Sequence, residues 1–378
     1  MWIYLIIFVF WLFIYAFNKH SLSKASFLFL FMGLAIFVGL GDMLGGYDRY
    51  IYGELFDSVA EQIQLHGDNY FNSSLYRLYP NEIGYGFFNI ALSYLTLNRY
   101  IFIFILTLIS YVLIYRSIIR YCDNYQLAVI IFLGLMFFFT FTYLRQVLAF
   151  SIAWQSIQYV YKRKLLKFII VVFIAATFHN SAILLFPFYF IPIKKYSPWI
   201  IVSIALILLG LGMTNIVGGM YETYSETMDD RRGIYAADET GFRIEYIFEA
   251  IVFLILLLPF QKYIPDTKKH ITLYNVAIYF CFILLIFIQS VNGGRLAWYA
   301  AIGIISTLSF LCQQLWHMPN YRITVITICF FLYIRILFSW DYMLYPYKTF
   351  LTDGHRDNDK VFELYEYDYN YDVDKFYK

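Results

Sequence analysis

Long apolar segments recur along almost the whole chain, and they limit its fold more than any other feature of the sequence. A membrane-spanning helix needs about 20 mostly apolar residues. Segments close to that length lie at about residues 2–17, 26–41, 100–116, 126–142, 146–161, 165–178, 181–193, 197–213, 245–260, 271–290, 296–312 and 323–338. The sequence therefore predicts an all-α, polytopic membrane helical bundle with about 12 transmembrane helices.

The composition excludes a soluble protein of this size. Of the 378 residues, 61% are hydrophobic and 14% are charged. A soluble domain carries roughly 25% charged residues, so lipid must cover much of the exterior. The formal net charge of +2 gives no electrostatic support for a nucleic-acid partner.

The remaining composition points to neither a metal nor a cofactor. The four cysteines, Cys122, Cys281, Cys312 and Cys329, are scattered and mostly lie within apolar segments, without metal-ligand spacing or a disulfide framework. We interpret them as small apolar residues. No Gly-rich nucleotide loop is found, so an ATP-driven mechanism has no support. The first apolar segment lacks a basic start and a cleavage site, which favours a retained span over a signal peptide.

Lysine and arginine between the segments set the predicted orientation, because they concentrate in cytoplasmic loops. If the twelve segments alternate, one side collects Lys19, Lys24, Arg116, Arg120, Lys162, Arg163, Lys164, Lys167, Lys194, Lys195, Lys262, Lys268, Lys269 and Arg322. We assign that side to the cytoplasm, which puts both termini outside. Residues 83–97 are apolar too. We interpret them as an interfacial or re-entrant helix on the outer side, and one further crossing is the alternative.

This orientation divides the chain into a transmembrane domain, residues 1–340, and a Tyr- and Asp-rich tail, residues 341–378. Two large outer loops, about 42–99 and 214–244, interrupt the domain. The inner links are short and basic. Chemistry or recognition is therefore expected on the outer face.

Three cationic or potentially cationic residues lie at predicted outer junctions between spans: Arg145, His179 and Arg295. Positive charge on the outer side runs against the usual distribution. The turns are tight, so these side chains can face a shared cavity. The alternative is that each arginine extends to the lipid headgroups and that His179 is an ordinary polar residue at the start of a span.

Carboxylates accompany these cations on the outer side. Asp48 follows a Gly-Gly turn after the second span, and Glu82 precedes the apolar stretch 83–97. Both are candidates for a site at the membrane surface, although most carboxylates of an acidic loop are simply solvated. Glu249 and Arg335 lie in the outer parts of two spans, and we expect a structural ion pair between them.

Six sequence pieces occur in a characteristic order: GGYDRYIY, NEIGYGFFN, YLRQVLAFSIAWQSIQYVYKRK, AATFHNSAILLFPFYFI, NGGRLAWYA and YPYKTF. With them the chain resembles the EpsG family from about residue 40 to 350. This family is related to the Wzy-type polymerases that make O-antigen, capsule or exopolysaccharide. The resemblance implies a multi-pass glycosyltransferase in the bacterial inner membrane, with a GT-C-like architecture and large outer loops.

The resemblance also implies the reaction and its partners. A growing glycan on undecaprenyl pyrophosphate is transferred, on the outer face, to the non-reducing-end sugar of a fresh lipid-linked repeat unit. The partners would be these two lipid-linked glycans and the membrane lipids, with a chain-length regulator as a further candidate. No cofactor is expected, because the lipid pyrophosphate bond drives the transfer.

Roles for the polar residues follow from that reaction. Arg145 and Arg295 are assigned to the pyrophosphate, because a guanidinium binds phosphate oxygens in pairs, and Gln146 is a neighbouring donor. His179 donates to the leaving group or positions the acceptor. Asp48 is the preferred general base and Glu82 the second choice.

Three other classes of protein stay open at this point. A flippase or transporter of lipid-linked sugars also needs many spans and cationic cavity residues, but it usually shows related halves, which this sequence lacks. An O-antigen ligase uses similar donors with another acceptor. A membrane acyltransferase would typically need a histidine-based site, for which His179 alone is insufficient.

Overall fold

The computed structural model of the chain describes residues 1–18, 21–65, 67, 69–214, 242–290 and 292–352. Within these residues the protein is helical and has no strand, apart from one isolated antiparallel bridge between Gly41 and Thr349. Four helices are long and apolar enough to cross a membrane: Arg99–Tyr121 (α6), Lys268–Ile286 (α15), Gly293–Gln314 (α16, η6 and α17) and Pro319–Ser339 (α18). The all-α prediction is confirmed, and the figure of about 12 spans stays a prediction.

Shorter helices account for the other predicted segments. They are α1 (Trp2–Phe17), α2 (Lys24–Leu40), α7 (Tyr125–Leu135), the 3-10 helix η3 (Phe138–Phe141), α8 (Leu144–Trp154), α9 (Ile157–Tyr161), α10 (Leu165–Phe178), the 3-10 helix η4 (Asn180–Phe190), α11 (Pro198–Gly212) and α14 (Ile244–Leu257). Two predicted segments are each broken in the middle, where α7 gives way to η3 and α8 to α9. Pro187 lies inside η4, where it lacks an N–H and removes a helical hydrogen bond.

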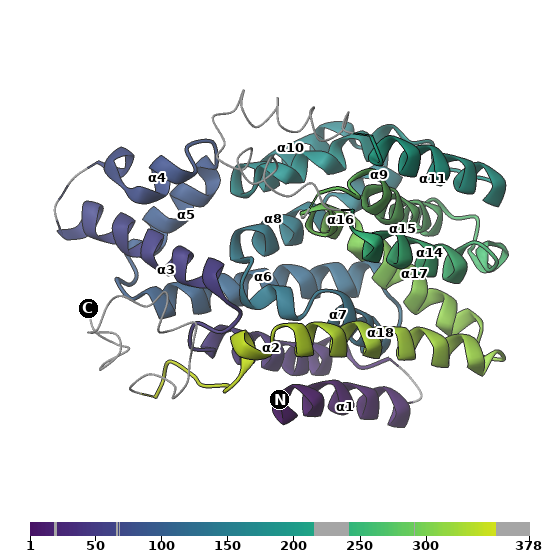
Figure 1. The fold of residues 1–378 in the computed structure, drawn as a ribbon, viewed down its shortest axis with the longest axis horizontal. Coiled ribbons are helices and arrows are strands. Elements are labelled where there is room, and N and C mark those ends of the chain that lie inside the picture. Colours follow the sequence, from purple (N-terminus) through teal and green to yellow (C-terminus); the bar gives the residue numbers. More distant parts are fainter. Residues whose placement is uncertain (19–20, 66, 68, 215–241, 291, 353–378) are drawn as a thin grey trace.

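The long helices lie side by side with roughly parallel axes (Figure 1). α2, α6, α8 and α10 pack in a row, α15 contacts α17, α14 and α11, and α7 contacts α1 and α18. Large side chains on the outside of this bundle are apolar, for example Trp199, which is 82% exposed, and Phe331, which is 66% exposed. Such surfaces suit lipid rather than water.

A layer of short helices covers one end of the bundle (left in Figure 1). It contains α3 (Tyr47–Ala60), the π-helix η1 (Glu61–Leu65), the 3-10 helix η2 (Tyr70–Asn72), α4 (Ser74–Leu78) and α5 (Ile83–Ser93). We call it the outer helical layer. The ring of Phe56 stacks on Phe102 of α6 with centroids 4.2 Å apart. The Asp57 carboxylate accepts hydrogen bonds from Arg99 at 2.5 and 2.8 Å.

The α5 helix bears on the one ambiguous segment of the topology. It has 11 residues, Ile83–Ser93, and an α-helix rises about 1.5 Å per residue. Its length is therefore roughly 16 Å, about half of the ~30 Å hydrocarbon core of a bilayer. This helix packs against α3 and α10. It is too short to cross the membrane alone, and such a length is what an interfacial or re-entrant helix requires.

Arg49 fastens the outer helical layer to the bundle. Its buried guanidinium donates to the main-chain carbonyl oxygens of Phe141 and Gly41, each at 2.8 Å, and of Val38 at 3.2 Å. Carbonyls at the end of a helix such as α2 carry partial negative charge, so they suit a buried cation. Burial still lowers the pKa of Arg49, to about 10.

The first and last described segments lie against each other. The Tyr4 hydroxyl donates to the Leu344 carbonyl oxygen at 2.7 Å, and the Tyr333 hydroxyl donates to the Tyr4 carbonyl oxygen at 2.7 Å. The chain after the short helix α19 (Asp341–Leu344) then reaches the segment just after α2, where the Asp42 N–H donates to the Lys348 carbonyl oxygen at 2.8 Å. Most of the predicted loop 214–244 and of the tail lies outside the described residues.

Candidate functional site

Arg145 and Gln146 lie in the first turn of α8, which begins at Leu144, shortly after η3. The start of a helix carries partial positive charge, so a cation in the first turn is unfavourable without an anion nearby. Both side chains are nearly buried, with 5% of Arg145 and 4% of Gln146 exposed. The local sequence therefore requires an acidic partner from elsewhere in the chain.

Glu82 is that partner. Its carboxylate forms an ion pair with the Arg145 guanidinium, and the two side chains are 1% and 6% exposed. The ring of Tyr79 lies 3.5 Å from the guanidinium carbon, and Tyr52 approaches from another side at 5.3 Å. Two aromatic rings and a carboxylate thus hold the Arg145 side chain between the outer helical layer and α8.

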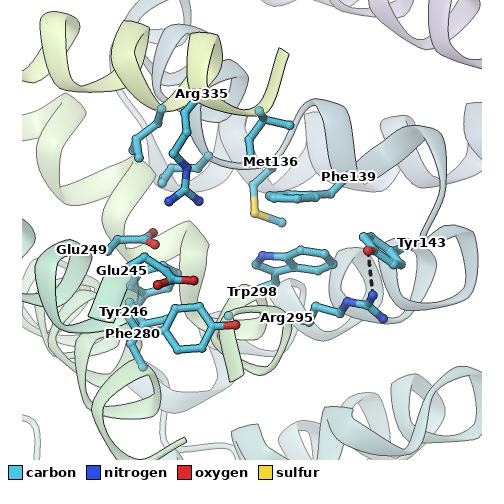
Figure 2. A pocket seen from close by; sticks show the side chains of 16 residues that line it. Met136, Phe139, Tyr143, Glu245, Tyr246, Glu249, Phe280, Arg295, Trp298 and Arg335 are labelled. Atoms are coloured by element: carbon cyan, nitrogen blue, oxygen red, sulfur yellow. Dashed lines mark hydrogen bonds between the residues drawn. The ribbon is translucent and has the colours of Figure 1, made fainter. Parts of the chain in front are cut away.

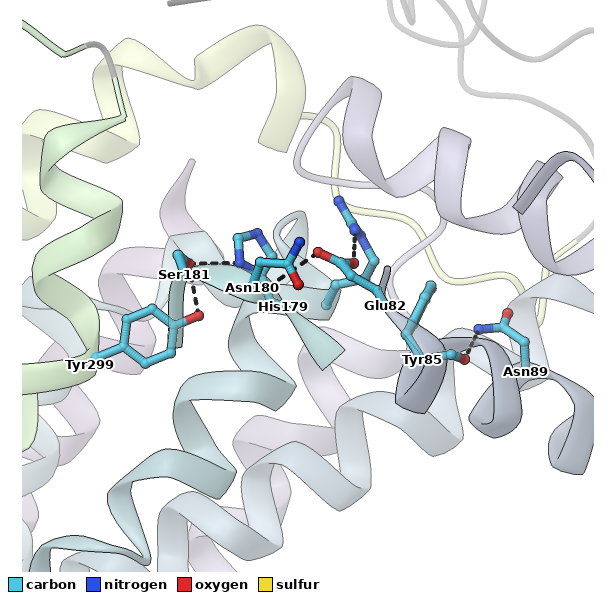
Figure 3. A network of polar contacts seen from close by, with 8 residues as sticks. Glu82, Tyr85, Asn89, His179, Asn180, Ser181 and Tyr299 are labelled. Carbon is cyan, nitrogen blue, oxygen red and sulfur yellow. Dashed lines mark hydrogen bonds and ion pairs between the residues drawn. The ribbon is translucent and has the colours of Figure 1, made fainter. Parts of the chain in front are cut away.

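A second polar contact links Glu82 to the end of α10. Its other carboxylate oxygen accepts from the Asn180 N–H at 3.4 Å. His179, at the C-terminal cap of α10, has its Nδ1 2.7 Å from the Ser181 hydroxyl, which lies 3.0 Å from the Tyr299 hydroxyl. Figure 3 shows both sets of contacts, which adjoin because His179 and Asn180 are consecutive residues. The protonated nitrogen of His179 is not fixed by these contacts.

Arg295 lies in α16 (Gly293–Ala297), four residues before Tyr299. Its guanidinium donates to the Tyr143 hydroxyl at 2.6 Å and lies 3.7 Å from the centre of that ring. The Gln146 side chain donates to the Arg295 carbonyl oxygen at 3.0 Å. Within the described residues Arg295 forms no ion pair. Its positive charge is therefore available to an anionic ligand.

Asp48 lies in the first turn of α3, where its negative charge suits the helix start. The side chain is half-buried, and no described residue hydrogen-bonds to it. The pKa of Tyr143 is raised, mainly because the side chain is buried. The charge of Arg295 acts to lower this pKa, and the charge of Asp48 acts to raise it. Burial likewise raises the pKa of Tyr52, with the same opposition between Arg145 and Asp48. Asp48 therefore acts electrostatically on both arginine–tyrosine pairs.

A cavity of about 270 Å³ adjoins Arg295. We call it the α14–α18 cavity, because Glu245 and Glu249 of α14 line one side and Arg335 of α18 lines the opposite side (Figure 2). Trp298 lies between these groups and Arg295. The expected ion pair between Glu249 and Arg335 is wrong, since neither forms one within the described residues. The two charges instead face a shared space.

The structure brings five of the six predicted site residues into three neighbouring sets of polar contacts, which we call the network. Glu82 pairs with Arg145 and accepts from the Asn180 N–H, Gln146 donates to Arg295, and His179 contacts Ser181, which contacts Tyr299. The sets adjoin because Arg145 and Gln146, and likewise His179 and Asn180, are consecutive residues. Asp48 forms none of these hydrogen bonds, but its charge acts on Tyr52 and Tyr143 beside the network. The sequence interpretation missed the tyrosines that line it and Ser181: Tyr52, Tyr79, Tyr143, Ser181 and Tyr299. Ser181 follows His179 by two positions and Tyr299 follows Arg295 by four, which was the available signal. The sequence has 38 tyrosines and gave no means to choose among them.

Metal-binding groups are a separate question. Over the described ranges, no three His, Cys, Asp or Glu side chains come together in a way that could hold a metal ion. Guanidinium groups such as those of the network can bind anions, and carboxylate and imidazole groups can transfer protons.

Comparison with known proteins gives one match. The model of a protein family described as the EpsG family matches residues 24–349. No curated protein and no solved structure matches the chain. The matched range contains every residue of the network and of the α14–α18 cavity.

Proposed function

Because the chain belongs to the EpsG family, a family of membrane proteins of the polysaccharide-polymerase type, we propose that it joins lipid-linked oligosaccharide repeat units on the outer face of the bacterial inner membrane. The donor carries the growing glycan on undecaprenyl pyrophosphate. The acceptor is a fresh lipid-linked repeat unit. The product glycan is an O-antigen, a capsule or an exopolysaccharide.

The observation that carries the proposal is that Glu82, Arg145, His179 and Arg295 are gathered in one region: Glu82 pairs with Arg145 and contacts the residue after His179, and the residue after Arg145 contacts Arg295. They come from four helical regions far apart in the sequence. In the predicted orientation, Arg145, His179 and Arg295 lie at outer junctions between spans, and Glu82 lies in the first outer loop. A purely structural bundle has no reason to gather so many ionisable groups at the membrane surface, where desolvation makes them costly.

The chemistry of glycan transfer assigns work to each group. The acceptor hydroxyl oxygen attacks the anomeric carbon of the donor glycan, and the bond from that carbon to the phosphate oxygen breaks. Asp48 takes the hydroxyl proton, since no described residue engages its carboxylate. The departing lipid pyrophosphate keeps the bonding electron pair, and Arg295 stabilises its negative charge in surroundings shielded from water.

The Arg145–Glu82 pair has a different part in this scheme. The Glu82 carboxylate is already occupied by Arg145 and the Asn180 N–H, so it orients Arg145 rather than accepting the proton. Arg145 adds positive charge beside the pyrophosphate. His179, through Ser181 and Tyr299, positions the acceptor.

A deletion strain complemented with the gene and its variants tests the function. The wild-type gene is expected to restore long surface glycan, and Arg295→Ala is expected to leave single repeat units at the surface. Membrane abundance is measured for each variant. Arg77→Ala, an exposed arginine of α4, is the matched control and is expected to keep long glycan.

The deletion strain also separates the competing classes. Single repeat units on the cell surface agree with a lost polymerase. Repeat units trapped on the inner side of the membrane would indicate a flippase, and long polymer that stays on its lipid carrier would indicate a ligase. Either result would contradict the proposed function.

A further inference from the structure

The α14–α18 cavity contains side chains that the transfer chemistry above leaves without a task. They are Glu245, Tyr246 and Glu249 of α14, Trp298 and Arg335. The lining residues lie toward the N-terminal end of α14 and toward the C-terminal end of α18. In the predicted orientation both are outer ends. The cavity therefore lies on the same side of the membrane as the network, and Arg295 lines both.

The charges in this cavity are balanced and held apart. Glu245 and Glu249 are one helical turn apart, so they share a face of α14. Arg335 stands across from them and Arg295 at the far end (Figure 2). Opposite charges attract strongly where little water screens them, yet none of these four forms an ion pair within the described residues. Arg295 donates one hydrogen bond to Tyr143, and no described residue hydrogen-bonds to the side chains of Glu245, Glu249 or Arg335. Their hydrogen-bonding groups and the other donors of Arg295 therefore remain available to a ligand.

This balance selects the chemical class of the ligand. The two carboxylates repel a phosphate or another anion, and the two guanidinium groups repel an ammonium ion. An uncharged ligand with many hydroxyl groups is repelled by neither. Each hydroxyl can donate to a carboxylate and accept from a guanidinium, so such a ligand satisfies both kinds of side chain.

Aromatic side chains complete the match. Trp298 is 5% exposed and packs on Phe139 with ring centroids 4.7 Å apart, so its ring is held firmly. The apolar face of a sugar ring packs well on such a surface. The volume of about 270 Å³ is just below the roughly 300–1,000 Å³ of typical ligand pockets. It suits one ring rather than a whole repeat unit.

We propose that the α14–α18 cavity is a subsite for a single pyranose residue of the glycan. Glu245, Glu249 and Arg335 bind its hydroxyl groups, and Trp298 packs against its face. This inference rests on the proposed function, which supplies the glycan. The ring comes either from the reducing end of the donor glycan or from the non-reducing end of the acceptor, because both meet at the reacting bond.

Equilibrium binding tests the subsite. The purified full chain in lipid nanodiscs is incubated with radiolabelled lipid-linked repeat unit extracted from the deletion strain, and the retained label is counted. Glu249→Gln removes a charged hydrogen-bond acceptor, so affinity is expected to fall about 10-fold or more. Trp298→Phe is expected to weaken binding several-fold. The matched controls are Glu54→Gln, an exposed carboxylate of α3, and Trp316→Phe, 75% exposed, and both should bind as the wild type does.

Two modified competitors identify the source of the ring. Repeat unit released from its lipid and reduced with borohydride has an opened reducing-end ring. Repeat unit trimmed by an exoglycosidase lacks its non-reducing terminal sugar. Loss of competition by the reduced glycan assigns the cavity to the donor, and loss by the trimmed glycan assigns it to the acceptor.

The results separate this subsite from the function on which it rests. Equal affinity of the wild type, Glu249→Gln and Trp298→Phe overturns the subsite, as does competition that neither modification weakens. A wild-type protein that binds the glycan through the cavity but makes no polymer in the same nanodiscs refutes the proposed polymerase and leaves the subsite standing. Polymer formation without any effect of the cavity variants does the reverse.

Discussion

Two arginines at the predicted outer end of the bundle lie in opposite kinds of surroundings. Arg145 is closed in: a carboxylate pairs with it, an aromatic ring covers it, and 5% of its surface is exposed. Arg295 is open: it contacts one tyrosine and lines a cavity. The sequence had assigned both arginines the same role, binding of the pyrophosphate.

The difference is between a guanidinium that already has a counter-charge and one that can receive a counter-charge from a ligand. Arg145 has its anion already, so its position is fixed before substrate arrives, and preorganised charges need little rearrangement during a reaction. Arg295 lacks an anion within the described residues, so a ligand can supply one. Substitutions around Arg145 are therefore expected to lower both stability and activity. Substitutions around Arg295 are expected to lower activity alone.

Breaking the Arg145–Glu82 pair is expected to have the largest effect. Glu82→Gln leaves a buried guanidinium without its counter-charge, which typically costs roughly 3–5 kcal/mol. Thermal unfolding of the purified variant should begin at a lower temperature, and long glycan should be lost from the surface. The double variant Arg145→Met with Glu82→Leu should recover stability without polymer. Long glycan made by that double variant would reduce the pair to a structural element.

Asp48→Asn tests the base without disturbing the fold. The side chain is half-buried and forms no hydrogen bond or ion pair with a described residue, so the unfolding temperature should stay close to that of the wild type. The rate of polymer formation should fall about 10²–10⁴-fold, the usual contribution of a general base. Glu54→Gln on the same helix serves as its control. A wild-type rate in Asp48→Asn would remove this residue from proton transfer.

Arg295 is expected to show a rate effect with little change in stability. Arg295→Ala should slow transfer about 10²–10³-fold, as the loss of one group stabilising a developing charge commonly does. Arg295→Lys keeps the charge but loses the paired donors of the guanidinium, so its rate should lie between. Initial rates in nanodiscs measure both. Destabilisation comparable to that of Glu82→Gln would erase the distinction between the closed and open regions.

Tyr143→Phe is expected to give the smallest effect. It removes the hydroxyl that accepts the 2.6 Å hydrogen bond of Arg295 and keeps the ring 3.7 Å away. One hydrogen bond is worth about 0.5–1.5 kcal/mol, so the rate should fall about tenfold or less. Tyr94→Phe, at a 69% exposed tyrosine, is the control.

The sequence was sufficient for the helical framework and for part of the site. Apolar length alone placed α1 and α10 within the limits that the structure gives, because a lipid-facing helix is specified mainly by its hydrophobic extent. Charge against the topological trend singled out Arg145, His179 and Arg295. These signals are local, so they can be read from a single sequence.

The pairing of charges was beyond the sequence. Glu82 and Arg145 are 63 positions apart, and neither the spacing nor the composition says which carboxylate meets which arginine. Glu249 and Arg335 were expected to pair, but α14 and α18 hold them on opposite sides of a cavity. Only the packing of the intervening helices decides between an ion pair and a binding space.

The contacts between Tyr4, Tyr333 and Leu344 constrain how the protein is assembled. During synthesis the first helix emerges more than three hundred residues before its hydrogen-bonding partners exist. It must wait at the membrane with the Tyr4 hydroxyl and carbonyl oxygen lacking these bonds until α18 and α19 have left the ribosome. A chain that stops before Leu344 cannot form the hydrogen bond between the Tyr4 hydroxyl and the Leu344 carbonyl oxygen. Nascent and truncated products therefore differ from the finished protein in how the N-terminal helix is held.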